Sequence, residues 1–308
     1  MSTLKAVFDE SGAERLLRTL YPNVHSLTAL TGGEASRAYA FSAGDRRLVL
    51  RVNHLFAYQR DAWASGKFEG TAVTAPQVLK IGQAGSHFWA VSEMAPGTML
   101  SNLALCDIEP VQNDLVQILI AVHETPIPDS TGGFGRIDDT GNAAAATWHE
   151  FLVGDGRYGS FVDWDKALAR AEASQRSLVE KSWSVADTLL EICPEERAFA
   201  HGDYNLDNIL SDGRRITGVV DWSNCLYGDP VWDVAWTDLW TAELQFASAY
   251  FQLKPSQDGE LRLLCYKLLI AAESLGFYIH TEQSEKGHWL ESRLDIVLQE
   301  ATRWHPPR

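Results

Sequence analysis

The spacing of apolar residues changes from alternating to helical near residue 95, and this change restricts the fold more than any other feature. Before that point we predict a helix over 4–21, three strands, a polar helix near 58–68 and two further strands. Short turns, "AGD" and "AGS", join neighbouring strands, so a small antiparallel sheet is expected. The predicted strands cover 25–30, 37–43, 46–53, 76–83 and 87–94.

After the segment "APGTML" (95–100) the pattern becomes mostly helical. A helix is predicted over 107–124, and a loop rich in Gly and Pro follows over 125–142. We therefore predict an α+β, bilobal chain with an N-terminal lobe at 1–95 and a larger, mostly helical lobe at 96–308. The later helices are expected near 147–154, 163–181, 184–191, 231–251, 259–281 and 288–303.

Charge and composition limit the classes of partner. The 308 residues carry a formal net charge of -15 and no stretch rich in Lys or Arg, which argues against a nucleic-acid partner. The charge suits a cationic small molecule, although acidity that serves only solubility is an equal alternative. No run approaches the roughly 18 apolar residues of a membrane span, and no signal-peptide pattern begins the chain. A cytoplasmic protein without a membrane partner is expected, with a monomer favoured.

Four cysteines are spread singly, without a CxxC pair or a His/Cys cluster. This pattern is typical of core or surface thiols, and it makes a disulfide framework or a zinc site the less favoured alternative. The four are Cys106, Cys193, Cys225 and Cys265.

Two polar stretches, "HGDYNLDN" (201–208) and "VVDWSNCLYGDP" (219–230), stand beside strand-like apolar runs. Clustered carboxylates in such a place are costly unless a cation binds them. Asp203, Asn208 and Asp221 together suit phosphoryl transfer: one carboxylate accepts a hydroxyl proton, while an amide and a second carboxylate hold Mg²⁺ beside nucleotide phosphates. A loop between two short strands, followed by a third strand, allows all three residues to converge.

His201 has two interpretations. It could act as a catalytic base, but a residue that braces the loop through hydrogen bonds is favoured. The "HxD" pair could also indicate a metal hydrolase, which the scarcity of other histidines at ligand spacing makes a minor alternative.

"HGDYNLDNIL" followed by "GVVDWSNCLYGDPVWDVAW" resembles the aminoglycoside phosphotransferase family. "LTGGEASRAYAF", "LVLRVN", "APGTML", "GFG" and "TWHEFL" are similar, in the same order, to the hygromycin B branch of that family. The resemblance covers roughly residues 25–250. It implies a protein-kinase-like fold, ATP or GTP as phosphate donor, Mg²⁺ as cofactor and a polycationic sugar as substrate.

The family's roles carry over to the matching residues. The resemblance implies that Asp203 is the catalytic base, that Asn208 and Asp221 bind magnesium, and that Asp233 supports the loop that His201 braces. The segment "TGGEAS" (31–36), with Gly32, Gly33 and Ser36, would cover the phosphates, although a GG pair alone is more often an ordinary turn.

One departure from the family pattern lies on the third strand. Arg51 stands where kinase-like proteins usually place a phosphate-binding lysine, and it can still contact two phosphate oxygens. Its expected acidic partner is Asp61, with Glu69 as the competitor, and plain surface charges are the alternative. Glu93 and Met94, in the "SEMAPG" hinge at 92–97, would contact adenine through their peptide groups.

The acceptor site is expected among acidic and aromatic residues that follow the second magnesium ligand. On a helix, tryptophans at every fourth position form an aromatic ridge that could pack against the sugar, and a ridge buried in the core is the alternative. The candidates are Asn224, Asp229, Trp236, Asp238 and Trp240.

The leading hypothesis is a nucleotide-dependent, magnesium-requiring kinase of an aminoglycoside hydroxyl, with hygromycin B as first choice. A kinase of the same fold that acts on a sugar, an amino alcohol or another antibiotic is the second. A nucleotide-binding pseudokinase is the third, and its only support is the replacement of lysine by Arg51, because Asp203, Asn208 and Asp221 are all present.

Overall fold

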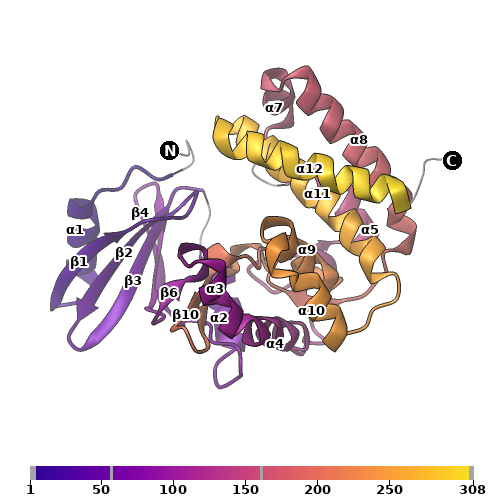
Figure 1. Ribbon diagram of the computed structural model, residues 1–308. Coiled ribbons are helices and arrows are strands. Elements are labelled where there is room, and N and C mark those ends of the chain that lie inside the picture. The colour runs from indigo at the N-terminus through magenta and orange to yellow at the C-terminus, as the bar shows by residue number, and fades with distance from the viewer. Residues whose placement is uncertain (1–4, 56–57, 160–161, 305–308) are drawn as a thin grey trace. The chain divides into compact units, whose positions relative to one another are not determined.

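The computed structural model describes residues 5–55, 58–159 and 162–304 (Figure 1). The chain folds into two compact units. Unit 1 comprises Met1–Asp114 and Leu206–Ser223, and unit 2 comprises Leu115–Asn205 and Asn224–Arg308. Residues 206–223 join unit 1 because their strands pair with a strand at Thr98–Met99. The predicted division into lobes at residue 95 stays a prediction, since these two units are defined by contacts within the chain.

Unit 1 contains a five-stranded antiparallel sheet in the order β1-β2-β3-β5-β4. All five strands lie close to the ranges that the sequence predicted, and burial alternates along β3, where Leu48, Leu50 and Val52 are buried. The strands are β1 (Val24–Leu30), β2 (Arg37–Ala43), β3 (Arg46–Asn53), β4 (Val78–Ala84) and β5 (His87–Glu93).

The first helix, α1 (Glu10–Leu20), is shorter than the predicted helix over 4–21. The Asp9 carboxylate accepts a hydrogen bond of 2.7 Å from the Gly12 N–H, and this N-cap starts the helix at residue 10. Helix α1 packs its apolar face against the sheet, where the buried core consists of Ala13, Leu17, Tyr39, Phe41, Leu48, Leu50, Val52, Trp89 and Val91.

Unit 1 also contains a second, three-stranded sheet in the order β11-β10-β6, while α2 packs against β4 of the first sheet. Gly97 has a φ of +104°, and a Cβ there would lie 2.4 Å from the Ser211 carbonyl oxygen, so only glycine fits at this crossing. The elements are α2 (Gln59–Lys67), β6 (Thr98–Met99), η1 (Leu100–Asn102), α3 (Leu105–Ile108), η2 (Glu109–Val111), η4 (Leu206–Asn208), β10 (Ile209–Ser211), β11 (Ile216–Val219) and η5 (Trp222–Asn224).

Unit 2 is mostly helical and is built around α11 (Gly259–His280). This helix is long and apolar enough to span a membrane, but 72% of that apolar window is buried inside the unit, where it packs against α7, α8, α9 and α12. Figure 1 shows α12 running beside it. The other helices are α4 (Gln112–His123), α5 (Trp148–Val153), α6 (Asp155–Tyr158), α7 (Trp164–Arg170), α8 (Ala173–Leu189), η3 (Leu190–Ile192), α9 (Val231–Trp240), η6 (Ala242–Leu244), α10 (Phe246–Leu253) and α12 (Ser284–Trp304).

Three expectations for this half of the chain were wrong. The predicted helices over 163–181 and 184–191 have other bounds, because the chain breaks at 171–172, between α7 and α8, and α8 continues without a break to Leu189. The predicted loop over 125–142 contains strand β7 (Phe134–Ile137), which is too short and too rich in glycine to show alternation. It belongs to a sheet in the order β8-β7-β12-β9. The predicted helix over 231–251 is two helices, since Gln245, with a φ of +49°, interrupts it. The other strands are β8 (Ala143–Ala145), β9 (Ala198–Ala200) and β12 (Leu226–Gly228).

Candidate functional site

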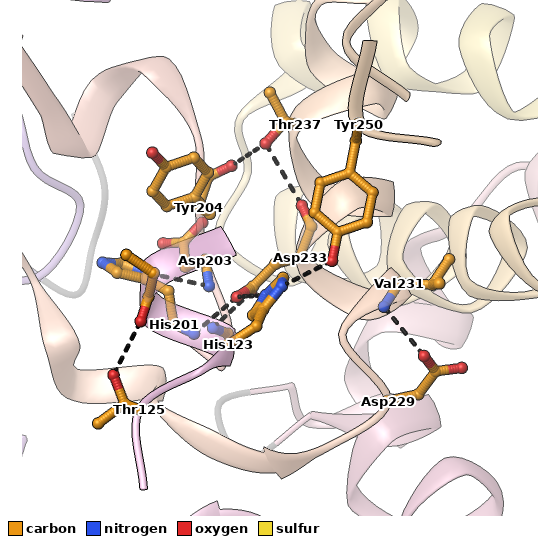
Figure 2. A network of polar contacts seen from close by, with 12 residues as sticks. His123, Thr125, His201, Asp203, Tyr204, Asp229, Val231, Asp233, Thr237 and Tyr250 are labelled. Atoms are coloured by element: carbon orange, nitrogen blue, oxygen red, sulfur yellow. Dashed lines mark hydrogen bonds and ion pairs between the residues drawn. The ribbon is translucent and has the colours of Figure 1, made fainter. Parts of the chain in front are cut away.

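In unit 2, a buried carboxylate on α9 holds the backbone of the loop that carries Asp203 (Figure 2). The two oxygens of Asp233 accept hydrogen bonds of 2.7 Å each from the N–H groups of His201 and Gly202. Gly202 has a φ of +80°, and a Cβ on it would lie 2.0 Å from the Asn224 carbonyl oxygen. The loop can therefore turn at this point only with glycine, and Asp233 fixes the direction of the turn.

Sequence reasoning missed His123, at the end of α4, which also contacts Asp233. Its Nε2 lies 3.1 Å from an Asp233 oxygen, and its Nδ1 lies 2.9 Å from the Tyr250 hydroxyl. A carboxylate accepts hydrogen bonds, so Nε2 carries a hydrogen, and in the neutral imidazole Nδ1 then accepts from the tyrosine. Figure 2 shows the three side chains in contact. A histidine in the sequence gives no signal for this, because its partners lie on distant helices.

Contacts on the other side of Asp203 also fix the loop. The Tyr204 side chain is fully buried, and its hydroxyl donates to the Leu115 carbonyl at 2.9 Å. Thr237 of α9 donates to the Tyr204 carbonyl at 2.5 Å. The Asp203 side chain itself stays half-buried, and the Asn205 amide donates to its Oδ1. The His201 Nδ1 accepts the Asp203 N–H at 3.3 Å, a contact that a loop brace would make.

In unit 1, the β10–β11 hairpin brings together the backbones of the two predicted magnesium ligands. The Val220 N–H donates to the Asn208 carbonyl at 2.9 Å, so Asn208 lies opposite the residue before Asp221. Asp221 has a φ of +62°, a left-handed conformation that aspartate tolerates better than most residues, and its carboxylate accepts the Ser223 hydroxyl at 2.8 Å.

Asn208 and Asp221 supply an amide and a carboxylate, which are the oxygen donors that Mg²⁺ prefers. Across the described residues, no group of three or more His, Cys, Asp or Glu side chains is placed to hold a metal ion. Magnesium usually keeps several waters and takes only one or two carboxylates together with substrate phosphates. The two residues therefore fit such an ion, provided that phosphate and water complete its coordination.

Arg51 and Asp61 form an ion pair within unit 1, with 3.2 Å between Nη2 and Oδ1. Their side chains are 18% and 3% exposed, so neither is a plain surface charge. Burial opposes the charge of Arg51, but Asp61, Tyr58 and Asp221 outweigh it and raise the pKa of the arginine. Burial also raises the pKa of Asp61, and Arg51 counteracts that rise. The competitor Glu69 is exposed and lies beyond the end of α2.

Tyr58 and Trp222, two residues that sequence reasoning missed, extend this pair. The Arg51 guanidinium lies 4.9 Å from the centre of the Tyr58 ring, and the Tyr58 hydroxyl lies 2.9 Å from the Ser36 hydroxyl. The Trp222 N–H donates to Asp61 at 3.0 Å. Contacts therefore run without a break from Ser36 of the predicted phosphate-covering segment, through Tyr58, Arg51 and Asp61, to Trp222, the residue after Asp221.

The segment 31–36 and the expected hinge also lie in unit 1. Gly32 and Gly33 are exposed, with φ values of +101° and +66°, a conformation that favours glycine. The N–H groups of Glu93 and Met94 donate to the Gln77 and Arg47 carbonyls at 3.0 Å and 3.2 Å. These two N–H groups are therefore already used within the sheet region, and the Glu93 carboxylate pairs with Arg46.

The acidic acceptor candidates have internal partners in unit 2. Asp229 is fully buried, pairs with Arg262 at 3.1 Å and accepts the Tyr266 hydroxyl at 2.6 Å. Asp238 pairs with Lys267 and is 8% exposed. Burial raises the pKa of Asp229, and the arginine counteracts that rise. Both carboxylates are thus part of the helical packing, although Asp238 and Lys267 also line a cavity of about 600 Å³ in unit 2. Asn224 is half-buried.

The expected tryptophan ridge on α9 divides into a core part and a more exposed part. Trp232 is 2% exposed and packs edge-on against Trp148, whereas Trp236 and Trp240 are partly exposed. Trp240 stacks on Trp289 of α12, with 5.3 Å between ring centres and 16° between planes. Trp289 is 48% exposed, and sequence reasoning missed it because it lies on another helix.

Comparisons with known proteins show the family and the fold of this chain. Residues 26–256 match the family model described as the phosphotransferase enzyme family. The hygromycin-B 4-O-kinase of Escherichia coli is 28% identical over 94% of this chain and 85% of its own length. A mouse protein, acyl-CoA dehydrogenase family member 10, is 24% identical over 67% of this chain and 20% of its own length.

Solved structures give the same result for the fold. The aminoglycoside phosphotransferase APH(4)-Ia, in ternary complex with AMP-PNP and hygromycin B, matches with a TM-score of 0.83 and 28% identity over 93% of this chain and 97% of that chain. Spectinomycin phosphotransferase APH(9)-Ia matches at 0.59 with 14% identity, over 96% and 94% of the two chains, which shows the fold alone. The predicted α+β, kinase-like fold is confirmed, and the chain belongs to the phosphotransferase enzyme family.

Proposed function

We propose that this chain is a nucleotide-dependent O-phosphotransferase that modifies a hydroxyl of an aminoglycoside or aminocyclitol antibiotic, with hygromycin B as first choice. The observation that carries the proposal is the loop 201–205, whose backbone is held by Asp233 while the Asp203 carboxylate stays half-buried. Likeness to a hygromycin-B 4-O-kinase over 94% of the chain supports the substrate class. Antibiotic resistance would be the biological role.

In this mechanism Asp203 accepts the proton of the acceptor hydroxyl. The hydroxyl oxygen forms a bond to the terminal phosphorus of the nucleotide as the nucleoside diphosphate leaves. Asn205 holds the carboxylate in one orientation through its amide, and His201 holds the Asp203 backbone. Much of the rate enhancement in such reactions comes from positioning of this kind.

The residues of unit 1 bind and orient the nucleotide. Arg51 supplies a permanent positive charge for phosphate oxygens, and Asp61 together with the ring of Tyr58 fixes the direction of its guanidinium. Asn208 and Asp221 would hold Mg²⁺, which when bound neutralises phosphate charge. ATP is the expected donor, with GTP as the alternative.

Gly32 and Gly33 allow the phosphates to approach the backbone closely, and Ser36 ties their segment to Tyr58. Adenine is expected at the peptide groups around Glu93 and Met94. The N–H groups of these two residues already have partners, so this contact would use other peptide groups of the hinge at 92–97.

For the acceptor, the partly exposed ring of Trp240 and the exposed ring of Trp289, with Trp236 beside Trp240, offer a flat surface on which a cationic sugar can pack. The net charge of -15 attracts a polycation over a longer range. Asn224 remains a candidate for a polar contact. We expect the protein to act in the cytoplasm as a monomer, without nucleic acid or membrane.

The test is mass spectrometry of hygromycin B incubated with the protein, Mg²⁺ and ATP. We expect a product with one added phosphate, and we expect Asp203→Asn to lower its rate of formation by about 10²-fold or more because the base is lost. Asp207→Asn is the matched control, since Asp207 is an exposed carboxylate four residues further along the chain, on η4, and it should leave the rate within about twofold.

Unchanged turnover in Asp203→Asn would contradict the mechanism. Phosphorylation of a neutral sugar or an amino alcohol, with none of any aminoglycoside, would contradict the substrate class. Nucleotide binding without transfer to any of these compounds would favour a pseudokinase.

A further inference from the structure

A segment before α1 lies along the glycine-containing segment 31–36 and is joined to it by hydrogen bonds, all within unit 1. The Lys5 Nζ donates to the carbonyl oxygens of Gly32 and Gly33 at 2.6 Å and 3.1 Å. The Ala6 N–H donates to the Ala35 carbonyl at 3.3 Å. Arg37 donates to the Ala6 carbonyl at 3.1 Å. We call residues 5–8 the N-terminal strap.

The far end of the strap is anchored to the sheet. The Tyr39 hydroxyl donates to the Phe8 carbonyl at 2.6 Å, and the Tyr39 side chain is only 4% exposed in the core of β2. The strap then enters α1 through the N-cap Asp9. The backbone that follows Lys5 is therefore joined to β2 at two points, the Ala6 and Phe8 carbonyls.

The contacts of Lys5 set the direction of two successive peptide groups. No cis peptide occurs in the described residues, and in a trans peptide the C=O and the following N–H point in opposite directions. With the Gly32 and Gly33 carbonyls turned toward the ammonium group, the N–H groups of Gly33 and Glu34 are turned to the opposite side. Successive N–H groups on one side of a turn are the donors that bind phosphate oxygens.

A glycine pair needs such an anchor. Glycine loses more backbone freedom on ordering than any other residue. A Cβ added at Gly32 would meet nothing within 4 Å, and one at Gly33 would meet only the Ser36 carbonyl oxygen, at 3.6 Å, so little packing surrounds the pair. Ser36, through the Tyr58 hydroxyl, fixes only its far end. Lys5, in contrast, binds the carbonyl oxygens of Gly32 and Gly33 directly.

We infer that Lys5 is a positioning residue that preorganises segment 31–36 for the terminal phosphates of the nucleotide. This inference rests on the proposed function, since it assigns the segment to phosphate binding. Lys5 acts through backbone N–H groups and does not contact the phosphates itself. Its effect should therefore grow with the number of phosphates on the ligand and be absent for the nucleoside.

Calorimetric titration of the full-length protein with adenosine, ADP and ATP in the presence of Mg²⁺ tests this role. Lys5→Met keeps the aliphatic stem and removes the donors. We expect it to lower the affinity for ATP about tenfold, the affinity for ADP by less, and the affinity for adenosine by less than about twofold. The KM for ATP should rise as the ATP affinity falls, whereas kcat at saturating ATP should change little. Lys5→Arg, which keeps several donors, should restore most of the ATP affinity.

Lys80→Met is the matched control. Lys80 also donates to a backbone carbonyl in unit 1, that of Leu20 at 3.1 Å, and its ammonium group lies 4.4 Å from the centre of the Tyr21 ring. These contacts are with the C-terminal end of α1 and not with the glycine segment. Its loss should leave the affinities for all three ligands unchanged.

Three results would contradict the inference about Lys5. They are unchanged ATP affinity in Lys5→Met, equal weakening of adenosine and ATP, and a fall in melting temperature with no selective loss of triphosphate binding. Failure of the wild-type protein to bind any nucleotide would instead contradict the proposed function. The two failures are therefore distinguishable.

Discussion

At the scale of single residues, the Arg51–Asp61 pair shows how a departure from the family pattern is accommodated. Lysine presents one compact charge, whereas the planar guanidinium needs a partner that fixes its plane. Asp61 binds one edge of this group, and the Tyr58 ring packs against it. Asp61 is in turn fixed by the Trp222 N–H. An arginine can therefore serve in a position where a lysine is usual, because its direction is set by these neighbours.

Substitutions at Arg51 test this interpretation. Arg51→Gln removes the charge and should lower kcat/KM for ATP by about 10²-fold, a typical loss for one donor to a charged transition state. Arg51→Lys keeps the charge but loses the planar contacts, and it should lower kcat/KM for ATP by less than Arg51→Gln does. Steady-state kinetics with hygromycin B measures both.

Arg18→Gln is the control for these two variants. Arg18 is an arginine of unit 1 whose partner, Glu14, lies on the surface of α1, and its loss should leave kcat/KM unchanged. Equal activity of Arg51→Gln and the wild type would show that Arg51 does not act on the nucleotide.

At the scale of elements, the loop between β9 and η4 is shaped by its neighbours more than by its own residues. Helix α9 supplies Asp233 and Thr237, which bind the loop on either side of Asp203. The end of η5 supplies the Asn224 carbonyl against which Gly202 packs. Two elements distant in sequence therefore decide the path of five residues, and a change at Gly202 should affect stability and activity together.

Gly202→Ala should destabilise the protein by about 3 kcal/mol or more, because it adds a clash with backbone to left-handed strain. Gly213→Ala is a matched control: Gly213 has a φ of +86°, close to the +80° of Gly202, but a Cβ there would meet nothing within 4 Å. It should cost only the strain, about 1 to 2 kcal/mol. Unfolding in denaturant compares the two, and equal losses would contradict a role for the Asn224 contact.

At the scale of the whole molecule, the proposed ligands should stabilise the fold. A ligand that binds only the folded state, at 100 times its dissociation constant, adds about 2.7 kcal/mol to the free energy of unfolding. The residues assigned to nucleotide and magnesium lie mainly in unit 1, and the base and the acceptor residues lie in unit 2. Stabilisation by each ligand can therefore be followed separately.

Thermal unfolding with and without a non-hydrolysable ATP analogue tests the metal assignment. The melting temperature should rise with the analogue and Mg²⁺, and EDTA should remove part of this rise. In Asp221→Asn the part that depends on Mg²⁺ should shrink, because the amide is a weaker ligand than the carboxylate. An undiminished response to Mg²⁺ would mean that Asp221 does not hold the ion.

The sequence by itself determined the class of fold, the five strands of the first sheet and the loop motif. Alternation in 46–53 is a local consequence of one more deeply buried face, and "HGDYNLDN" is a contiguous signal. The sequence also predicted Asp61 as the acidic partner of Arg51, but it left Glu69 as an alternative partner. Strand β7 and the break between α9 and α10 were not predictable, since short strands and left-handed residues carry little local pattern.

Only the tertiary structure decided which partner each polar group has. It pairs Arg51 with Asp61 and buries Asp229 against Arg262. It also brings Trp289 onto Trp240 and Lys5 onto the carbonyls of the glycine segment. Such pairs join residues separated along the chain, and their free energy depends on burial and direction. A sequence records the residue types that can pair, whereas packing in three dimensions selects which of them meet.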